Sequence, residues 1–118
     1  MSIVLHVLAV ISLTSASSRA LPQVVPEPAQ KALYCADVLL ALSVEEEDAE
    51  AKARHLESST ALNKLGVRLL IEAGWNETMA TLRVGSFGEE VEEAYFGDGT
   101  LRFSVPDCMT HAATAAMP

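Results

Sequence analysis

The feature that most constrains the fold is a stripe of apolar residues between positions 59 and 75. Residues three and four apart share one face of a helix, so this spacing predicts the second half of a long helix. Clustered carboxylates at positions 45–48 suit the positive N-terminal end of a helix dipole, and Gly74 suits the position just past a helix end. We therefore expect a long central helix with Leu69 deep in the core; the stripe consists of Leu62, Leu65, Leu69 and Ala73, widened by Val67 and Leu70.

Three further segments carry helical patterns. Residues 29–43 form a broad apolar face on which Lys31 and Asp37 are the only charges, so this helix should be buried on most sides. Asn76 is a good N-cap for a helix over residues 77–84. The segment Ser86-Phe87-Gly88-Glu89 has the capping-box arrangement, which predicts that another helix starts there and ends at Gly97. The sequence thus predicts an all-α fold, a small bundle of about four helices around a long central helix.

The C-terminal end has a different pattern. Leu101, Phe103 and Val105 alternate with polar residues, as in a half-buried strand. A lone strand is not stable, so we expect residues 100–105 to be a short extended C-terminal arm packed on the helices. The alanine-rich end predicts a frayed tail. The expected organisation is a signal peptide at 1–20, a Pro-rich leader at 21–28, a single helical domain at 29–109 and a flexible tail at 110–118.

The first twenty residues have the pattern of a secretory signal. The apolar run from Ile3 to Leu13 has the length of a signal core and is too short to span a bilayer. Ser18 and Ala20 occupy the two positions that the peptidase requires to be small, so the mature chain should begin near Leu21. The alternatives are a buried N-terminal helix and a retained membrane anchor. We expect a secreted or periplasmic protein with no stable membrane insertion after cleavage.

The two cysteines, Cys35 and Cys108, lie far apart in the sequence. In an exported protein, an even pair predicts one disulfide bond, which would join the first helix to the C-terminal arm. The alternative is a zinc site, in which the two thiols combine with His55 and His111. The ligand spacing lacks the usual close couplets, and thiols pair with each other first in an oxidising compartment, so we expect no metal.

The charge balance limits the class of partner. The chain has 16 acidic and 8 basic residues, a formal net charge of −8 at pH 7. Loss of residues 1–20 would remove Arg19 and no acidic residue, and would make the mature chain more acidic still. Nucleic acid and anionic membranes are therefore poor partners, because both bind clustered Lys and Arg. A basic protein partner is the better expectation.

No catalytic motif stands out, so we expect neither an enzyme nor a cofactor. Gly85-Ser86-Phe87-Gly88 lacks the spacing of a nucleophile elbow, and the acidic cluster at 45–50 lacks the pattern of a calcium loop. The favoured hypothesis is a small acidic protein-binding module. The alternative is a periplasmic stress holdase of the acid type, in which protonation of carboxylates exposes apolar helices to client proteins. The candidate partner-binding acidic face consists of Glu89, Glu90, Glu92 and Glu93.

Overall fold

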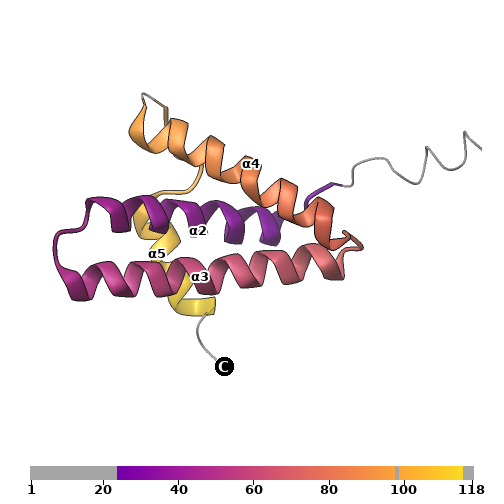
Figure 1. Ribbon diagram of the computed structural model, residues 1–118, viewed down its shortest axis with the longest axis horizontal. Helices are drawn as coiled ribbons and strands as arrows, with labels where there is room; N and C mark the ends of the chain where they lie inside the picture. The colour runs from indigo at the N-terminus through magenta and orange to yellow at the C-terminus, as the bar shows by residue number, and fades with distance from the viewer. Residues whose placement is uncertain (1–23, 98, 116–118) are drawn as a thin grey trace, which may run out of the picture.

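The computed structural model describes residues 24–97 and 99–115, and these residues form a small helical bundle (Figure 1). The helices are α2 (Glu27–Glu45), α3 (Ala49–Glu72), α4 (Glu77–Phe96) and α5 (Val105–Ala115). The prediction of an all-α bundle is confirmed. The expected signal peptide and the first three residues of the expected leader lie outside the described residues. The last two leader residues, Glu27 and Pro28, already belong to α2.

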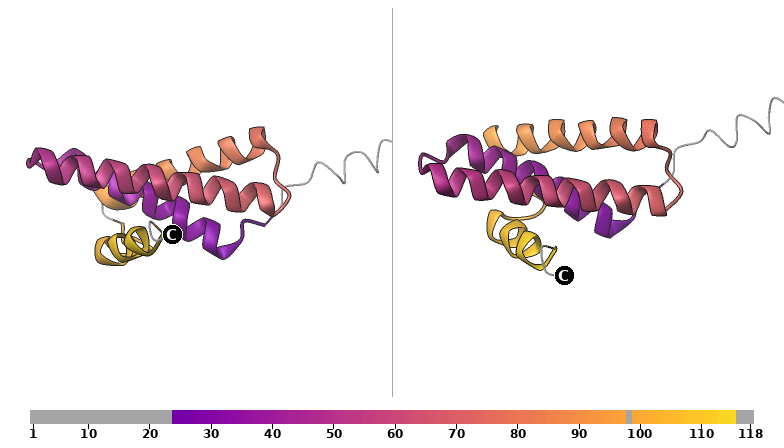
Figure 2. Two further views of the ribbon diagram at one scale, coloured as in Figure 1. Left: turned by 90° about the horizontal axis from the view of Figure 1, so that it is seen from below. Right: turned by 60° about the horizontal axis from the view of Figure 1, so that its bottom comes forward.

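Helix α2 touches each of the other three helices. Figures 1 and 2 show it lying between α3 and α4, with α5 crossing the α2–α3 pair on another side. This position explains why its sequence is apolar almost all round, as a helix buried on most sides must be. Its fully or nearly fully buried residues include Ala29, Ala32, Leu33, Tyr34, Cys35, Ala36, Val38 and Leu39.

Helix α3 is the longest helix among the described residues, and it begins directly after the carboxylates at 45–48 and ends just before Gly74, as predicted. The Asp48 carboxylate accepts a hydrogen bond from the Ala51 backbone N–H at 2.9 Å. Gly74 follows the last turn with a φ of 99°, in the left-handed region that glycine tolerates.

The core face of α3 is displaced from the predicted stripe. Leu62 and Leu70 are fully buried, whereas Leu69 is only half-buried, so the prediction that Leu69 is deeply buried is wrong. The reason is Gly66, which lies midway between the two buried leucines and receives the side chain of Leu33 from α2. A search for apolar side chains overlooks a face whose central residue is glycine.

Helix α4 is continuous, so the prediction of separate helices over 77–84 and from Ser86 onward is wrong. It begins as expected, because the Asn76 side chain accepts a hydrogen bond from the Met79 N–H at 2.8 Å. Ser86 does not cap a helix; its hydroxyl donates to the Arg83 carbonyl at 2.7 Å, within the helix. Phe87 and, one turn later, Val91 are buried against the bundle, and this packing keeps α4 helical across Gly85 and Gly88.

The C-terminal segment is partly irregular and partly helical. Residues 99–104 form neither helix nor strand and bend at Arg102 and Phe103, and α5 then runs to Ala115. The prediction of a flexible tail is therefore wrong for residues 110–115; residues 116–118 lie outside the described part. Pro106 is compatible with a first helical turn, and the Ser104 hydroxyl accepts a hydrogen bond from the Asp107 N–H at 3.2 Å. Cys108 and Ala112, four residues apart, form the buried face.

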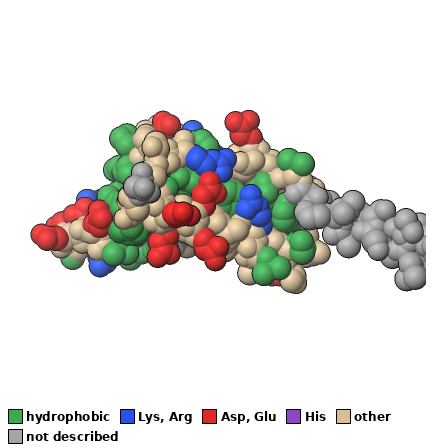
Figure 3. Space-filling view, turned by 90° about the horizontal axis from the view of Figure 1, so that it is seen from above, with side chains coloured by type: hydrophobic (Ala, Val, Ile, Leu, Met, Phe, Trp, Pro, Cys, Tyr) green, Lys and Arg blue, Asp and Glu red, His purple; other side chains and the backbone are tan. Residues whose placement is uncertain are grey.

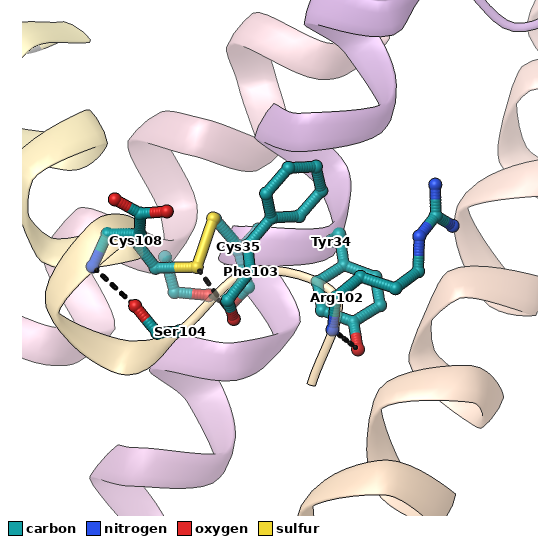
Figure 4. Close-up of a disulfide and its surroundings, with 9 residues drawn as sticks. Tyr34, Cys35, Arg102, Phe103, Ser104 and Cys108 are labelled. Atoms are coloured by element: carbon teal, nitrogen blue, oxygen red, sulfur yellow. Dashed lines mark hydrogen bonds between the residues drawn. A yellow bond between two sulfur atoms is a disulfide. The ribbon is translucent and has the colours of Figure 1, made fainter. Parts of the chain in front are cut away.

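A disulfide bond joins Cys35 of α2 to Cys108 of α5, with the two Cα atoms 5.0 Å apart (Figure 4). Both cysteines are fully buried. Beside the bridge, the Tyr34 hydroxyl accepts a hydrogen bond from the Arg102 backbone N–H at 3.0 Å. The Phe103 ring meets the Tyr34 ring edge-on, with centroids 5.6 Å apart. These contacts attach the C-terminal segment to the middle of the bundle.

Candidate functional site

An open groove of about 390 Å³ runs between α2 and α4. Its α2 side is formed by Asp37, Leu40, Ala41 and Val44, and its α4 side by Gly85, Gly88, Glu89, Val91, Glu92 and Phe96. At one end of the two helices, the Tyr95 hydroxyl donates a hydrogen bond to the Glu45 carboxylate at 3.2 Å. This bond fixes the end of α4 against the end of α2.

The rim of the groove carries exposed apolar side chains. Leu40 is 45% exposed, Val44 65% and Phe96 53%. Single exposed apolar residues are ordinary on a protein surface, but a cluster of them around one groove marks an interaction site. These three residues come from two helices and gather where α2 and α4 end together.

On its α4 side the groove is open because two of the lining residues, Gly85 and Gly88, have no side chain. A β-carbon on Gly85 would meet no atom within 4 Å, and one on Gly88 would make an ordinary contact of 3.8 Å with Asp37 Oδ1. Neither glycine is therefore required by packing inside the bundle. Glycine within a helix costs about 0.5–1 kcal/mol relative to alanine. The helix thus loses stability at two positions that open the groove.

Asp37 is the one charged residue that α2 places in the groove. Within the described residues, no hydrogen bond or ion pair joins its carboxylate to another side chain. Partial burial without a compensating partner raises the pKa of Asp37 from 3.8 to about 6. A titratable group whose pKa is raised by burial in a groove is a functional-site candidate.

The four glutamates of the predicted acidic face have different surroundings. Glu89 and Glu92 line the groove, and Glu93 is exposed on the same helix. The Glu90 carboxylate already forms an ion pair with the Arg102 guanidinium, at 3.2 Å. Figure 3, which looks onto the α4 side, shows red acidic side chains over this face, with blue basic side chains among them and green apolar patches beside them. The acidic surface next to the groove therefore consists of Glu89, Glu92 and Glu93.

The residues considered for a metal site are not brought together. The two thiols form the disulfide bond, and His55 lies 3.7 Å from the Glu46 carboxylate. Burial, and secondarily the nearby Lys31, lower the pKa of His111, and the described part of the chain supplies no hydrogen-bond partner for its buried Nε2. Residues 24–97 and 99–115 contain no group of three or more His, Cys, Asp or Glu side chains arranged to hold a metal ion.

Sequence reasoning missed most of the groove. Asp37 was visible as a lone carboxylate on an otherwise apolar helix, and that contrast was the signal available. The Ser86–Glu89 capping-box pattern predicts a helix start at this point, which places Gly85 between two helices and Gly88 in the first turn of the second. Only their position on a continuous α4 reveals that they face α2.

None of the helices over the described residues is both long and apolar enough to cross a bilayer. Searches against family models, curated proteins and solved structures find no match for this chain.

Proposed function

We propose that this chain is a non-enzymatic protein-binding module that receives its partner in the groove between α2 and α4. The observation that carries the proposal is the gathering of Leu40, Val44 and Phe96 around one groove, which also holds a carboxylate without an ion-pair partner among the described residues. Apolar side chains with a few placed polar groups are the usual composition of a binding site. The glycines support the same function, since their cost to helix stability has no compensating contact inside the bundle.

The charge of the chain supports a basic protein as the partner. The net charge is −8, and Glu89 and Glu92 lie at the groove itself. Complementary charge accelerates encounter and excludes acidic competitors. Nucleic acid stays a disfavoured partner for the same reason.

We further propose that the protein acts outside the cytosol, in the periplasm or as a secreted protein. The support is the signal-like pattern of residues 1–20, together with a disulfide bond that is compatible with an oxidising compartment. Intact-mass analysis of protein from the producing cell tests this directly. A mature chain beginning near Leu21 supports export, and a full-length chain with free thiols in the cytosol contradicts it.

The binding function is tested by affinity capture from an extract of the producing cell, with three forms of the chain compared. The wild type is compared with Val44→Lys at the groove and with Leu82→Lys elsewhere on α4. The two substituted residues are 65% and 67% exposed, so the variants carry a matched change of charge and polarity. We expect a protein captured by the wild type and by Leu82→Lys, lost with Val44→Lys, and weakened by salt. Equal capture by all three forms, or capture by none, would refute the groove as a docking site.

An acid-responsive holdase is the second candidate, favoured by one observation. Because the pKa of Asp37 is about 6, mild acidification neutralises the one charge of α2 in the groove and makes the surface more apolar. A holdase should then suppress aggregation of an unfolded client better at pH 5 than at pH 7. A module for a basic partner should lose binding over the same interval, so the two functions give opposite pH dependences.

A further inference from the structure

We propose that the groove receives an amphipathic helix of the partner, which places a lysine or arginine against Asp37 and apolar side chains against Leu40, Val44 and Phe96. This inference rests on the proposed function and specifies the chemistry of the partner. Three observations lead to it: the shape of the groove, its charge, and the absence of a partner for Asp37 in the described bundle.

The shape favours a helix as the occupant. The lining residues span positions 37–44 of α2 and 85–96 of α4, which correspond to roughly 10 Å and 16 Å of helix axis. Three of the lining residues, Ala41, Gly85 and Gly88, have minimal side chains. They allow another backbone to approach closely, as small residues do at helix–helix contacts. A helix of about three turns matches this length. Its residues at i, i+3, i+4 and i+7 would face the rim.

The charge favours a basic residue on that helix, near the end of the groove where Asp37 lies. Every charged residue lining the groove is acidic: Asp37 from α2, and Glu89 and Glu92 from α4. A second copy of this acidic chain would bring further carboxylates to the same place. A cation from the partner would instead give Asp37 the counter-charge that the bundle does not provide. An ion pair in such a partly desolvated position is stronger than one on an open surface.

The proposed ion pair predicts that binding weakens as the pH falls. Asp37 binds a cation only when it is ionised, and its pKa in the free chain is about 6. If the bound cation keeps it ionised, affinity falls about tenfold between pH 7 and pH 5. The other charged groups that line the groove with Asp37 are Glu89 and Glu92 of α4, and both are carboxylates that attract the same cation. The remaining lining residues are apolar or glycine.

A selection experiment tests the occupant. The probe is a displayed library of helical peptides of roughly 18 residues, with the positions of one face randomised and the other face fixed as alanine and glutamine. The folded, disulfide-bonded chain is the bait. Peptides that also bind the Gly85→Leu variant are discarded, because leucine at position 85 fills the groove. A β-carbon at this position meets no atom within 4 Å, and leucine favours a helix more than glycine does. The fold should therefore survive this substitution.

The expected result is an enriched group of peptides with one Lys or Arg flanked by apolar residues at helical spacing. Their affinity should fall about tenfold or more on Asp37→Asn and on acidification to pH 5, while Asp37→Asn should itself bind with no dependence on pH over that range. Groove-dependent peptides that lack a basic residue, or that bind Asp37→Asn equally well, would overturn the ion pair and leave the binding function standing. A library that yields no groove-dependent peptide would overturn the helical occupant. Loss of capture with Val44→Lys from the cell extract would separately show whether the binding function holds.

Discussion

Gly66 of α3 lies so close to Leu33 of α2 that a β-carbon at position 66 would overlap the Leu33 side chain. Leu33 is fully buried at this contact, and Leu62 and Leu70 pack on the same face of α3. The closeness of α2 and α3 therefore depends on a residue with no side chain. The glycines of α4 have the opposite surroundings, since Gly85 has open space where a side chain would be.

This contrast predicts opposite effects of the same substitution at two positions. Gly66→Ala should lower the free energy of unfolding by about 1–3 kcal/mol, because the helices must separate or Leu33 must leave its rotamer. Gly85→Ala should raise it by about 0.5–1 kcal/mol, because alanine favours helix and meets no neighbour. Urea unfolding of both variants measures the difference. Similar effects at the two positions would contradict the packing described for α3.

The corrected core face of α3 predicts a second contrast. Leu70→Ala should cost about 2–5 kcal/mol, because a fully buried side chain is replaced by a cavity. Leu69→Ala should cost clearly less, because Leu69 is only half-buried. Thermal or urea unfolding of the two variants is sufficient. A greater loss of unfolding free energy with Leu69→Ala than with Leu70→Ala would mean that α3 buries the predicted stripe and not the observed face.

The disulfide bond should contribute strongly to stability. It joins residues separated by 73 positions, and closing a loop of that length contributes about 4 kcal/mol in the chain-entropy model. The double variant Cys35→Ala/Cys108→Ala should therefore unfold at a much lower urea concentration than the oxidised wild type. Wild type unfolded in the presence of a reductant serves as the control and should approach the variant. A transition midpoint that neither change moves would contradict the bond as a stabilising element.

Asp37 should destabilise the fold at neutral pH. Its folded pKa of about 6 lies above the ordinary value of 3.8, so the folded chain holds a proton more firmly than the unfolded chain does. The free energy of unfolding therefore falls as pH rises from about 4 to about 6. Since the carboxylate is only partly buried, solvent screening limits the effect to about 1 kcal/mol.

Substitution by asparagine isolates this contribution. Asp37→Asn should be about 1 kcal/mol more stable than wild type at pH 7, and the difference should vanish near pH 4. Unfolding in urea across this pH range measures both values. A variant that is less stable than wild type at pH 7 would mean that the ionised carboxylate has a stabilising partner. A gain in stability would instead indicate that Asp37 serves binding rather than folding.

Local signals predicted much of this fold. The helix start at the 45–48 carboxylates, the cap at Asn76, the stop at Gly74, the all-helical class and the Cys35–Cys108 bond were available from the sequence because each rests on a few adjacent residues or on the cysteine count. The continuity of α4 was not, because the burial of Phe87 and Val91 against the bundle outweighs the local preference of Gly85 and Gly88 for a break. Helix α5, Val105–Ala115, was missed because its first residue completes an alternating pattern and its alanine-rich second half resembles a frayed tail.

The candidate site was less accessible from sequence than the fold. An acidic face on Glu89, Glu90, Glu92 and Glu93 follows from helical spacing alone, but the pairing of Glu90 with Arg102 depends on how the C-terminal segment returns to α4. The groove depends on the relative placement of α2 and α4. No pattern within either helix specifies that Asp37 faces Gly88.

Site-specific photo-crosslinking in the producing cell tests most directly whether a protein partner occupies the groove. A photoreactive phenylalanine analogue placed at Val44 lies at the groove, whereas the same analogue at Leu82 lies on α4 outside the groove lining. We predict a discrete crosslinked protein at position 44, none at position 82, and loss of the adduct when Gly85→Leu is added. No adduct at position 44, or the same adduct from both positions and unaffected by Gly85→Leu, would contradict a partner bound in the groove.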